Sequence, residues 1–77
     1  MPYQLIFSVH PNLASGTWVV FIGDRLLSEH VSYTDAVDEA FEAAEGGWSH
    51  SGITTEVSVV DLDGHVRLWR RYGPTLH

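Results

Sequence analysis

The sequence contains no cysteine, no lysine and no long apolar run, and each absence excludes a class of protein. Without cysteine, the chain forms neither a disulfide nor a thiolate metal site, and in 77 residues this favours a reducing, cytoplasmic setting. The N-terminal residues lack a basic region, and their apolar run is short and alternating. We therefore expect a soluble, cytosolic protein with neither a signal peptide nor a membrane span.

Positive charge is scarce. The chain has four arginines against ten acidic residues, which gives a net charge of −6. Binding to nucleic acid or to an anionic membrane needs clustered positive charge, so neither partner is expected. The acids concentrate in residues 35–45 and the arginines in residues 67–71. This uneven distribution suits contact with a protein partner or with a second copy of the chain.

One helix is predicted at residues 32–44. Ser32 is the expected N-cap, with Asp35 completing a capping box, and Gly46-Gly47 is expected to end the helix. Such a short helix needs a surface to lie on. Its apolar residues recur at spacings of three and four, which places in one stripe Tyr33, Ala36, Val37, Ala40, Phe41 and Ala44.

Four strands are expected around this helix, at residues 3–9, 17–22, 53–61 and 65–72. His10-Pro11-Asn12 is expected to break the first, and residues 25–31 either form a short strand or cross to the helix. The predicted fold is α+β, with the order β-β-α-β-β: a four-stranded antiparallel sheet with one helix packed on one face. It forms a single domain over residues 1–77, with a frayed tail at residues 73–77. The order of the strands stays open.

The last two strands flank Asp63-Gly64, the strongest short hairpin signal in the chain. A two-residue turn there predicts a register in which the paired residues are Val59 with Leu68, Ser58 with Trp69, Val60 with Arg67, and Glu56 with Arg71. Apolar residues then share one face, and an acid meets a base on the other.

Short motifs across residues 16–73 resemble a family of small bacterial domains of unknown function, number 2188. The motifs are Trp18-x-Val20, Ala36-Val37, Asp63-Gly64-x-Val66-Arg67 and Tyr72-Gly73. The resemblance implies a bacterial origin and carries no established activity. A looser resemblance, through Ser32-x-x-Asp35-Ala36, is to the N-terminal domains of HicB-type antitoxins.

No catalytic residue, cofactor or metal site is expected. The segment from Gly46 to Gly52 is similar to a nucleophile elbow, but it misses the required spacing and follows a helix, where the elbow follows a strand. The histidines are scattered without ligand spacing: His10, His30, His50, His65 and His77. The protein is therefore predicted not to be an enzyme.

Residues 48–52 are expected to form a loop that could offer Trp48 and His50 to a partner. The favoured alternative is that Trp48 folds back and caps the end of the core. The predicted helix also has an acidic face that could bind a cation or a basic partner, although a solvated face is the commoner explanation. Its members are Asp38, Glu39, Glu42 and Glu45.

Surplus apolar surface is the most informative feature, because one helix covers only one face of a sheet. Residues 17–22 are apolar on both faces, so one of two alternating sets is left uncovered. The first set is Trp18, Val20 and Ile22, and the second is Val19 and Phe21 with Thr17. The predicted interface on the back of the sheet comprises Ile6, Trp18, Val20, Ile22, Val60 and Trp69, flanked by Arg67 and Arg71. Alternatively, residues 25–31 or a different strand order cover this face.

The functional hypothesis is a non-enzymatic interaction module that forms a homodimer through this apolar face. The alternative is an antitoxin-like or regulatory protein that binds a basic protein partner. A pocket for a small ligand ranks last, because the sequence shows no convergent set of polar groups.

Overall fold

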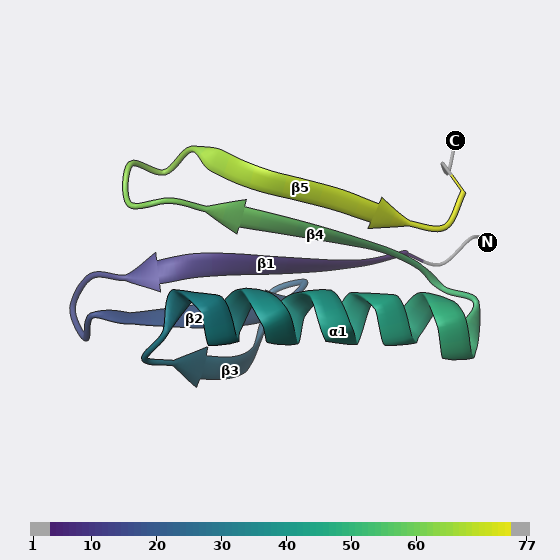
Figure 1. Ribbon diagram of the computed structural model, residues 1–77, viewed down its shortest axis with the longest axis horizontal. Coiled ribbons are helices and arrows are strands. Elements are labelled where there is room, and N and C mark those ends of the chain that lie inside the picture. The colour runs from purple at the N-terminus through teal and green to yellow at the C-terminus, as the bar shows by residue number, and fades with distance from the viewer. Residues whose placement is uncertain (1–3, 75–77) are drawn as a thin grey trace.

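The computed structural model describes residues 4–74 and contains one helix and five strands (Figure 1). In chain order the elements are β1 (Gln4–Asn12), β2 (Thr17–Ile22), β3 (Arg25–His30), α1 (Tyr33–Ser51), β4 (Thr54–Val60) and β5 (Val66–Tyr72). The strands form one sheet in the order β3-β2-β1-β4-β5, and α1 packs on one face of it. The predicted α+β class, with a single helix on a sheet, is confirmed.

The sheet differs from the predicted four-stranded antiparallel arrangement in two respects. Residues 25–30, which the sequence left open, form the edge strand β3 beside β2. In addition, β1 and β4 are parallel, whereas the other neighbouring strands are antiparallel. The parallel pair follows from the connection, because the chain returns along the sheet through α1 and then enters β4 in the direction of β1.

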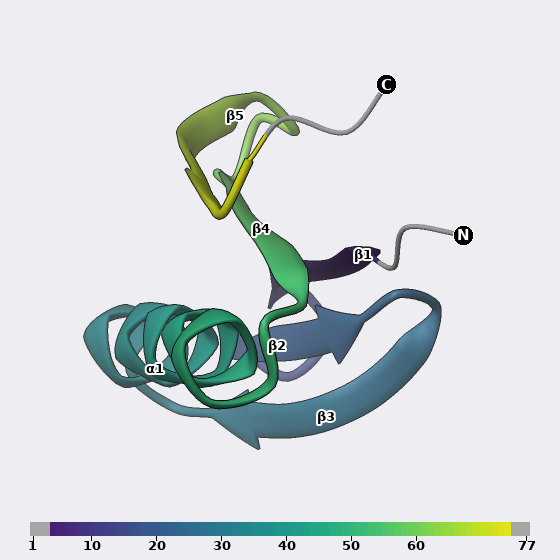
Figure 2. The same cartoon turned by 90° about the vertical axis from the view of Figure 1, so that its right-hand side faces the viewer.

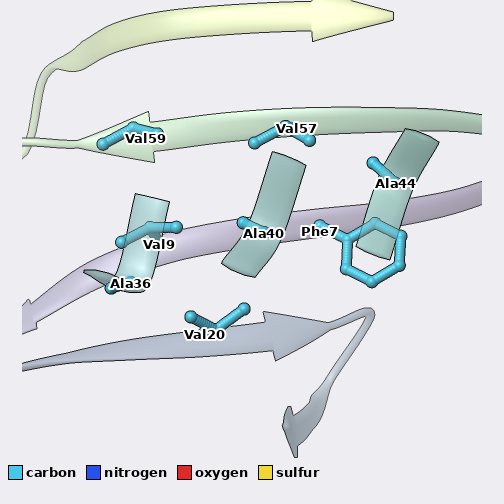
Figure 3. Packing of buried hydrophobic residues seen from close by; sticks show 8 residues of the cluster. All are labelled: Phe7, Val9, Val20, Ala36, Ala40, Ala44, Val57 and Val59. Atoms are coloured by element: carbon cyan, nitrogen blue, oxygen red, sulfur yellow. The ribbon is translucent and has the colours of Figure 1, made fainter. Parts of the chain in front are cut away.

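The core lies between α1 and the three central strands. Ala36, Ala40 and Ala44 recur every four residues on the helix and are fully buried. Because these side chains are small, α1 approaches the sheet closely. It covers the buried residues of β1, β2 and β4, which are Phe7, Val9, Val20, Val57 and Val59 (Figure 3).

The helix begins as predicted but ends later. The Ser32 hydroxyl accepts a hydrogen bond from the Asp35 N–H at 3.3 Å, which confirms Ser32 as the N-cap. The helix then continues through Gly46 and Gly47 and ends at Gly52, whose φ of 68° is left-handed. The prediction that Gly46-Gly47 ends the helix is therefore wrong.

Gly47 lies inside the helix at a point where α1 and β4 approach closely. A Cβ atom at Gly47 would lie 3.0 Å from Thr55 Cγ2. The Thr55 hydroxyl also donates a hydrogen bond of 2.6 Å to the Ala44 carbonyl, which ties the same turn of α1 to β4. The missing side chain thus permits a helix–strand contact.

The β4–β5 hairpin confirms three of the four predicted pairs: Val59 with Leu68, Ser58 with Trp69, and Glu56 with Arg71. The fourth is wrong, because Val60 lies opposite Val66 rather than Arg67. The Asp61 N–H donates to the His65 carbonyl at 2.9 Å, so the turn holds three residues and shifts the pairing by one. A bulge at Arg67 shifts it back, which is why the other pairs hold.

β1 extends through His10 and Pro11 to Asn12, where a break was predicted. Beyond Val9 this strand pairs with β2 alone, so a residue without an N–H group is tolerated on its free side. Tyr3, the predicted first strand residue, and residues 75–77 of the predicted tail lie outside the described residues.

Candidate functional site

The face of the sheet opposite α1 is covered by no other helix or strand within residues 4–74 (Figure 2). Phe7 and Val9 are buried beneath the helix, so the alternate residues of β1 point away from it. Residues directly opposite one another on paired strands share a face, which extends this surface across the sheet. We call it the open face; its apolar members are Ile6, Val19, Phe21, Leu26, Val60, Val66 and Trp69.

Large apolar side chains of the open face meet solvent. Ile6 is 47% exposed, Leu26 60% and Trp69 54%. At the centre, the rings of His10 and Phe21 pack edge to face with their centroids 5.7 Å apart. Apolar residues gathered on one exposed face are typical of an interaction surface.

Half of the predicted interface lies on the open face: Ile6, Val60, Trp69 and Arg71. Trp18, Val20 and Ile22 were misplaced, because the register puts Val20 opposite Val9 and turns all three toward α1. Since TWVVFI is apolar on both faces, its pattern does not determine which alternate residues point toward the helix. Arg67 was also misplaced, because the bulge directs it into a pocket beside Trp18.

The open face carries little uncompensated charge. Arg71 Nε and Nη2 donate to Glu56 Oε1 at 3.0 and 2.8 Å. The guanidinium carbon of Arg71 also lies 5.1 Å from the ring centroid of Trp69, a cation–π contact. At the β3 edge, a hydrogen bond from the Thr17 hydroxyl holds the pKa of Glu29 below its ordinary value. The charged side chains of Arg71 and Glu29 on this face are thus each engaged by neighbouring residues of the same face.

A second candidate site is an open pocket of about 430 Å³ near the start of α1. We call it the hairpin pocket; it is lined by Trp18, Tyr33, Asp61, Leu62, Asp63 and Arg67. The rings of Trp18 and Tyr33 meet edge to face at 4.8 Å, and Arg67 Nε donates to Asp61 Oδ2 at 2.8 Å. Aromatic and charged groups therefore converge here, which the sequence did not predict.

Asp61 holds the hairpin turn together. Its Oδ1 atom accepts hydrogen bonds from the N–H groups of Asp63 at 2.9 Å and His65 at 3.0 Å. Burial raises the pKa of Asp61, but these bonds and the Arg67 charge outweigh it and hold the pKa below its ordinary value. Ligand atoms of Asp61, Asp63 and His65 lie within 4.8 Å of one another. The contacts within the turn account for this clustering.

Ser28, His30 and Glu39 form a polar cluster that ties β3 to α1. His30 Nε2 lies 2.8 Å from Glu39 Oε1 and 3.2 Å from Ser28 Oγ, and Ser28 also donates to Glu39. Hydrogen bonds from His30 and then Ser28 lower the pKa of Glu39. A catalytic triad needs the serine and the carboxylate on opposite ring nitrogens, whereas here both contact Nε2. The geometry is that of a structural tie.

Trp48 and His50, predicted to lie in a loop, belong to the last turns of α1. The Trp48 ring lies against Gly73, where a Cβ atom would come within 2.9 Å of it. Thr54, beside this contact, donates a hydrogen bond to the Pro74 carbonyl at 3.4 Å. Trp48 thus packs on Gly73 beside the start of β4, is 38% exposed and lies outside the hydrophobic cluster, so its role as a cap of the core stays a prediction.

The acidic face predicted on the helix is divided. Glu39 turns toward β3, whereas Asp38, Glu42 and Glu45 are exposed on the outer side of α1. No ion pair is formed by these three residues within the described part of the chain. The uncompensated acids therefore lie on the side of the molecule opposite the open face.

Comparison with family models, curated proteins and solved structures found no match. The resemblances to the bacterial domain family and to HicB-type antitoxins therefore stay predictions. Within residues 4–74, α1 is too polar to cross a membrane.

Proposed function

We propose that this protein is a non-enzymatic interaction module that forms a homodimer through the open face of its sheet. The observation that carries the proposal is the one-sided coverage of the sheet. Helix α1 packs on one face, while Ile6, Leu26 and Trp69 expose about half of their surface on the other. Two copies stacked by these faces would bury both apolar surfaces at once.

The distribution of charge favours a second copy as the occupant. The chain carries a net charge of −6, so two copies repel one another unless their acids are kept apart. The exposed acids of α1 lie on the far side of the sheet: Asp35, Asp38, Glu42 and Glu45. A dimer joined by the open faces places these acids on its two outer surfaces. The acids of one copy are then separated from those of the other by more than the Debye length, which is about 8 Å at physiological salt.

Trp69 is the expected anchor of this interface. Tryptophan is enriched among the residues that dominate binding energy, and arginine is common beside it. Arg71 already stacks on Trp69 and is held by Glu56. These side chains therefore lose less conformational entropy when the dimer forms.

The test is to replace Trp69 by glutamate and measure the mass in solution. The wild-type chain should give twice its 8.6 kDa mass in native mass spectrometry, and Trp69→Glu should give a folded monomer. The expected loss is large, because the substitution removes the apolar anchor and would bury a new carboxylate in the interface. Circular dichroism checks that the variant is folded, as expected for a side chain that is 54% exposed.

Leu68→Glu is the matched control. Leu68 is the neighbouring residue on β5, is 44% exposed and points to the opposite face of the strand. This variant should stay dimeric. A wild-type monomer, or a Trp69→Glu variant that stays dimeric, would overturn the proposal. A stable complex with a basic protein instead of a dimer would favour the antitoxin-like alternative.

A further inference from the structure

Parallel strands β1 and β4 reach their carboxyl ends at the end of the sheet where α1 begins (Figure 1). The residues that line the hairpin pocket come from this end of the sheet. In sheets whose parallel strands are joined through a helix, ligands bind preferentially at this end. Segments far apart in the sequence meet here, since Trp18 comes from β2, Tyr33 from α1 and the remaining lining from residues 61–67. A smaller pocket of about 200 Å³ adjoins it and shares Trp18 and Leu62.

One wall of the pocket is apolar and aromatic. Trp18 packs against the core and holds Tyr33 edge to face, with an angle of 73° between their rings. Tyr33 is 39% exposed and Leu62 is 66% exposed, so the wall meets solvent. Such a wall suits the methylene stem of a long basic side chain, and exposed aromatic ring faces attract cations.

The charged groups of the pocket favour a cation. Asp61 is engaged by the turn and by Arg67, but the Asp63 side chain is exposed and makes no hydrogen bond within the described residues. Asp61, Asp63 and Arg67 together leave one negative charge. The positive end of α1 is already offset by the Ser32 cap and by an acid in the first turn.

Arg67 indicates which cation fits. Its guanidinium lies against a carboxylate in a pocket walled by two aromatic rings, although the side chain is 70% exposed. The pocket therefore already accommodates a guanidinium, and Asp63 supplies a second carboxylate that forms no ion pair within residues 4–74. The net charge of −6 adds long-range attraction for a basic partner.

We propose that the hairpin pocket binds an arginine side chain of a protein partner, with the stem along Trp18 and Leu62 and the guanidinium at Asp63. This inference goes beyond self-association and is independent of it, because the pocket includes Trp18 and Tyr33 on the helix side of the sheet.

The probe is N-acetyl-arginine amide, titrated into the ¹⁵N-labelled full chain and followed by two-dimensional NMR. Shifts should concentrate at the Trp18 indole N–H and at the amides of Leu62 and Asp63. N-acetyl-citrulline amide has nearly the same shape without the charge, and it should bind more weakly. Trp18→Phe identifies the indole signal among the three tryptophans.

Two variants test the assignment of the charge. Asp63→Asn should weaken binding by about two- to fivefold, as expected for an exposed ion pair. It retains the turn, because the turn is held by the Asp61 side chain and by Gly64 rather than by the Asp63 side chain. Arg67→Gln should strengthen binding by a similar factor, because it removes the competing guanidinium. Glu45→Gln removes a carboxylate from the outer side of α1 and should leave the affinity unchanged.

Three results would overturn the proposal. Equal affinity for the citrulline amide would show an apolar pocket without charge recognition. Shifts centred on α1 rather than on residues 61–67 would place the cation on the acidic helix. Unchanged affinity in Asp63→Asn would show that the Asp63 carboxylate does not contribute to binding of the probe. None of these readouts depends on the oligomeric state, so failure here and failure of the homodimer are distinguishable.

Discussion

Replacing Val59 and Val66 by alanine, one at a time, measures how much of the β4–β5 hairpin belongs to the core. The two substitutions remove the same atoms from one hairpin. Val59 on β4 is fully buried, whereas Val66 on β5 is 59% exposed. At Val59, two methyl groups at about 0.8 kcal/mol each plus a cavity give an expected loss of about 2–3 kcal/mol. At Val66, the buried fraction gives a loss below about 1 kcal/mol.

The expected loss at Val59 is large relative to the total free energy of unfolding. A chain of this size has a free energy of unfolding of about 4–12 kcal/mol, so Val59→Ala removes a large share of it. Urea unfolding, followed by tryptophan fluorescence, should show a lowered midpoint with an unchanged slope for Val59→Ala. The Trp69→Glu background keeps self-association from burying Val66. Equal losses at the two positions in that background would refute the assignment of β5 as a solvent-exposed edge.

Two further predictions concern α1. Because the His30 hydrogen bond lowers the pKa of Glu39 below its ordinary 4.5, the resulting stability is present above that pH and is lost as the pH falls through the folded-state pKa. Glu39→Gln should therefore lower the melting temperature at neutral pH and much less at about pH 3; equal effects would contradict a stabilising hydrogen bond between His30 and ionised Glu39. Gly46→Ala should stabilise the helix by about 0.5–1 kcal/mol, whereas Gly47→Ala should not, because its Cβ would press on Thr55. Equal gains would show that the helix and β4 are not in close contact there.

Local signals in the sequence predicted the elements whose partners are close in the chain. The Ser32 cap and the four-residue spacing of Ala36, Ala40 and Ala44 determine where α1 starts and which side it buries. The β4–β5 register was also predictable in its centre, because alternating apolar residues and the Glu56–Arg71 pair agree on it. In each case the residues that form the pattern and the residues that they contact lie within one short stretch of sequence.

Features that depend on distant segments were not predictable. Gly46-Gly47 predicts a helix end from the local sequence, but the helix continues to Ser51, and Gly47 lies where α1 approaches Thr55 of β4 closely. Val20 and Phe21 are equally apolar, so only the placement of β2 beside β1 decides that Val20 is core. The hairpin pocket was missed for the same reason, since Trp18 and the turn residues meet only through the parallel pairing of β1 and β4.

The two proposed surfaces make independent demands on the chain and can be separated. Trp69 lies on the open face, whereas Asp63 lies at the turn beside Tyr33 on the helix side. Residues on different surfaces with no shared partner should contribute additively. Trp69→Glu should therefore bind the arginine probe with unchanged affinity, and Asp63→Asn should dimerise normally. If Trp69→Glu lost both properties while staying folded, the pocket would be formed or ordered only in the dimer, and arginine binding would be a property of the assembled pair.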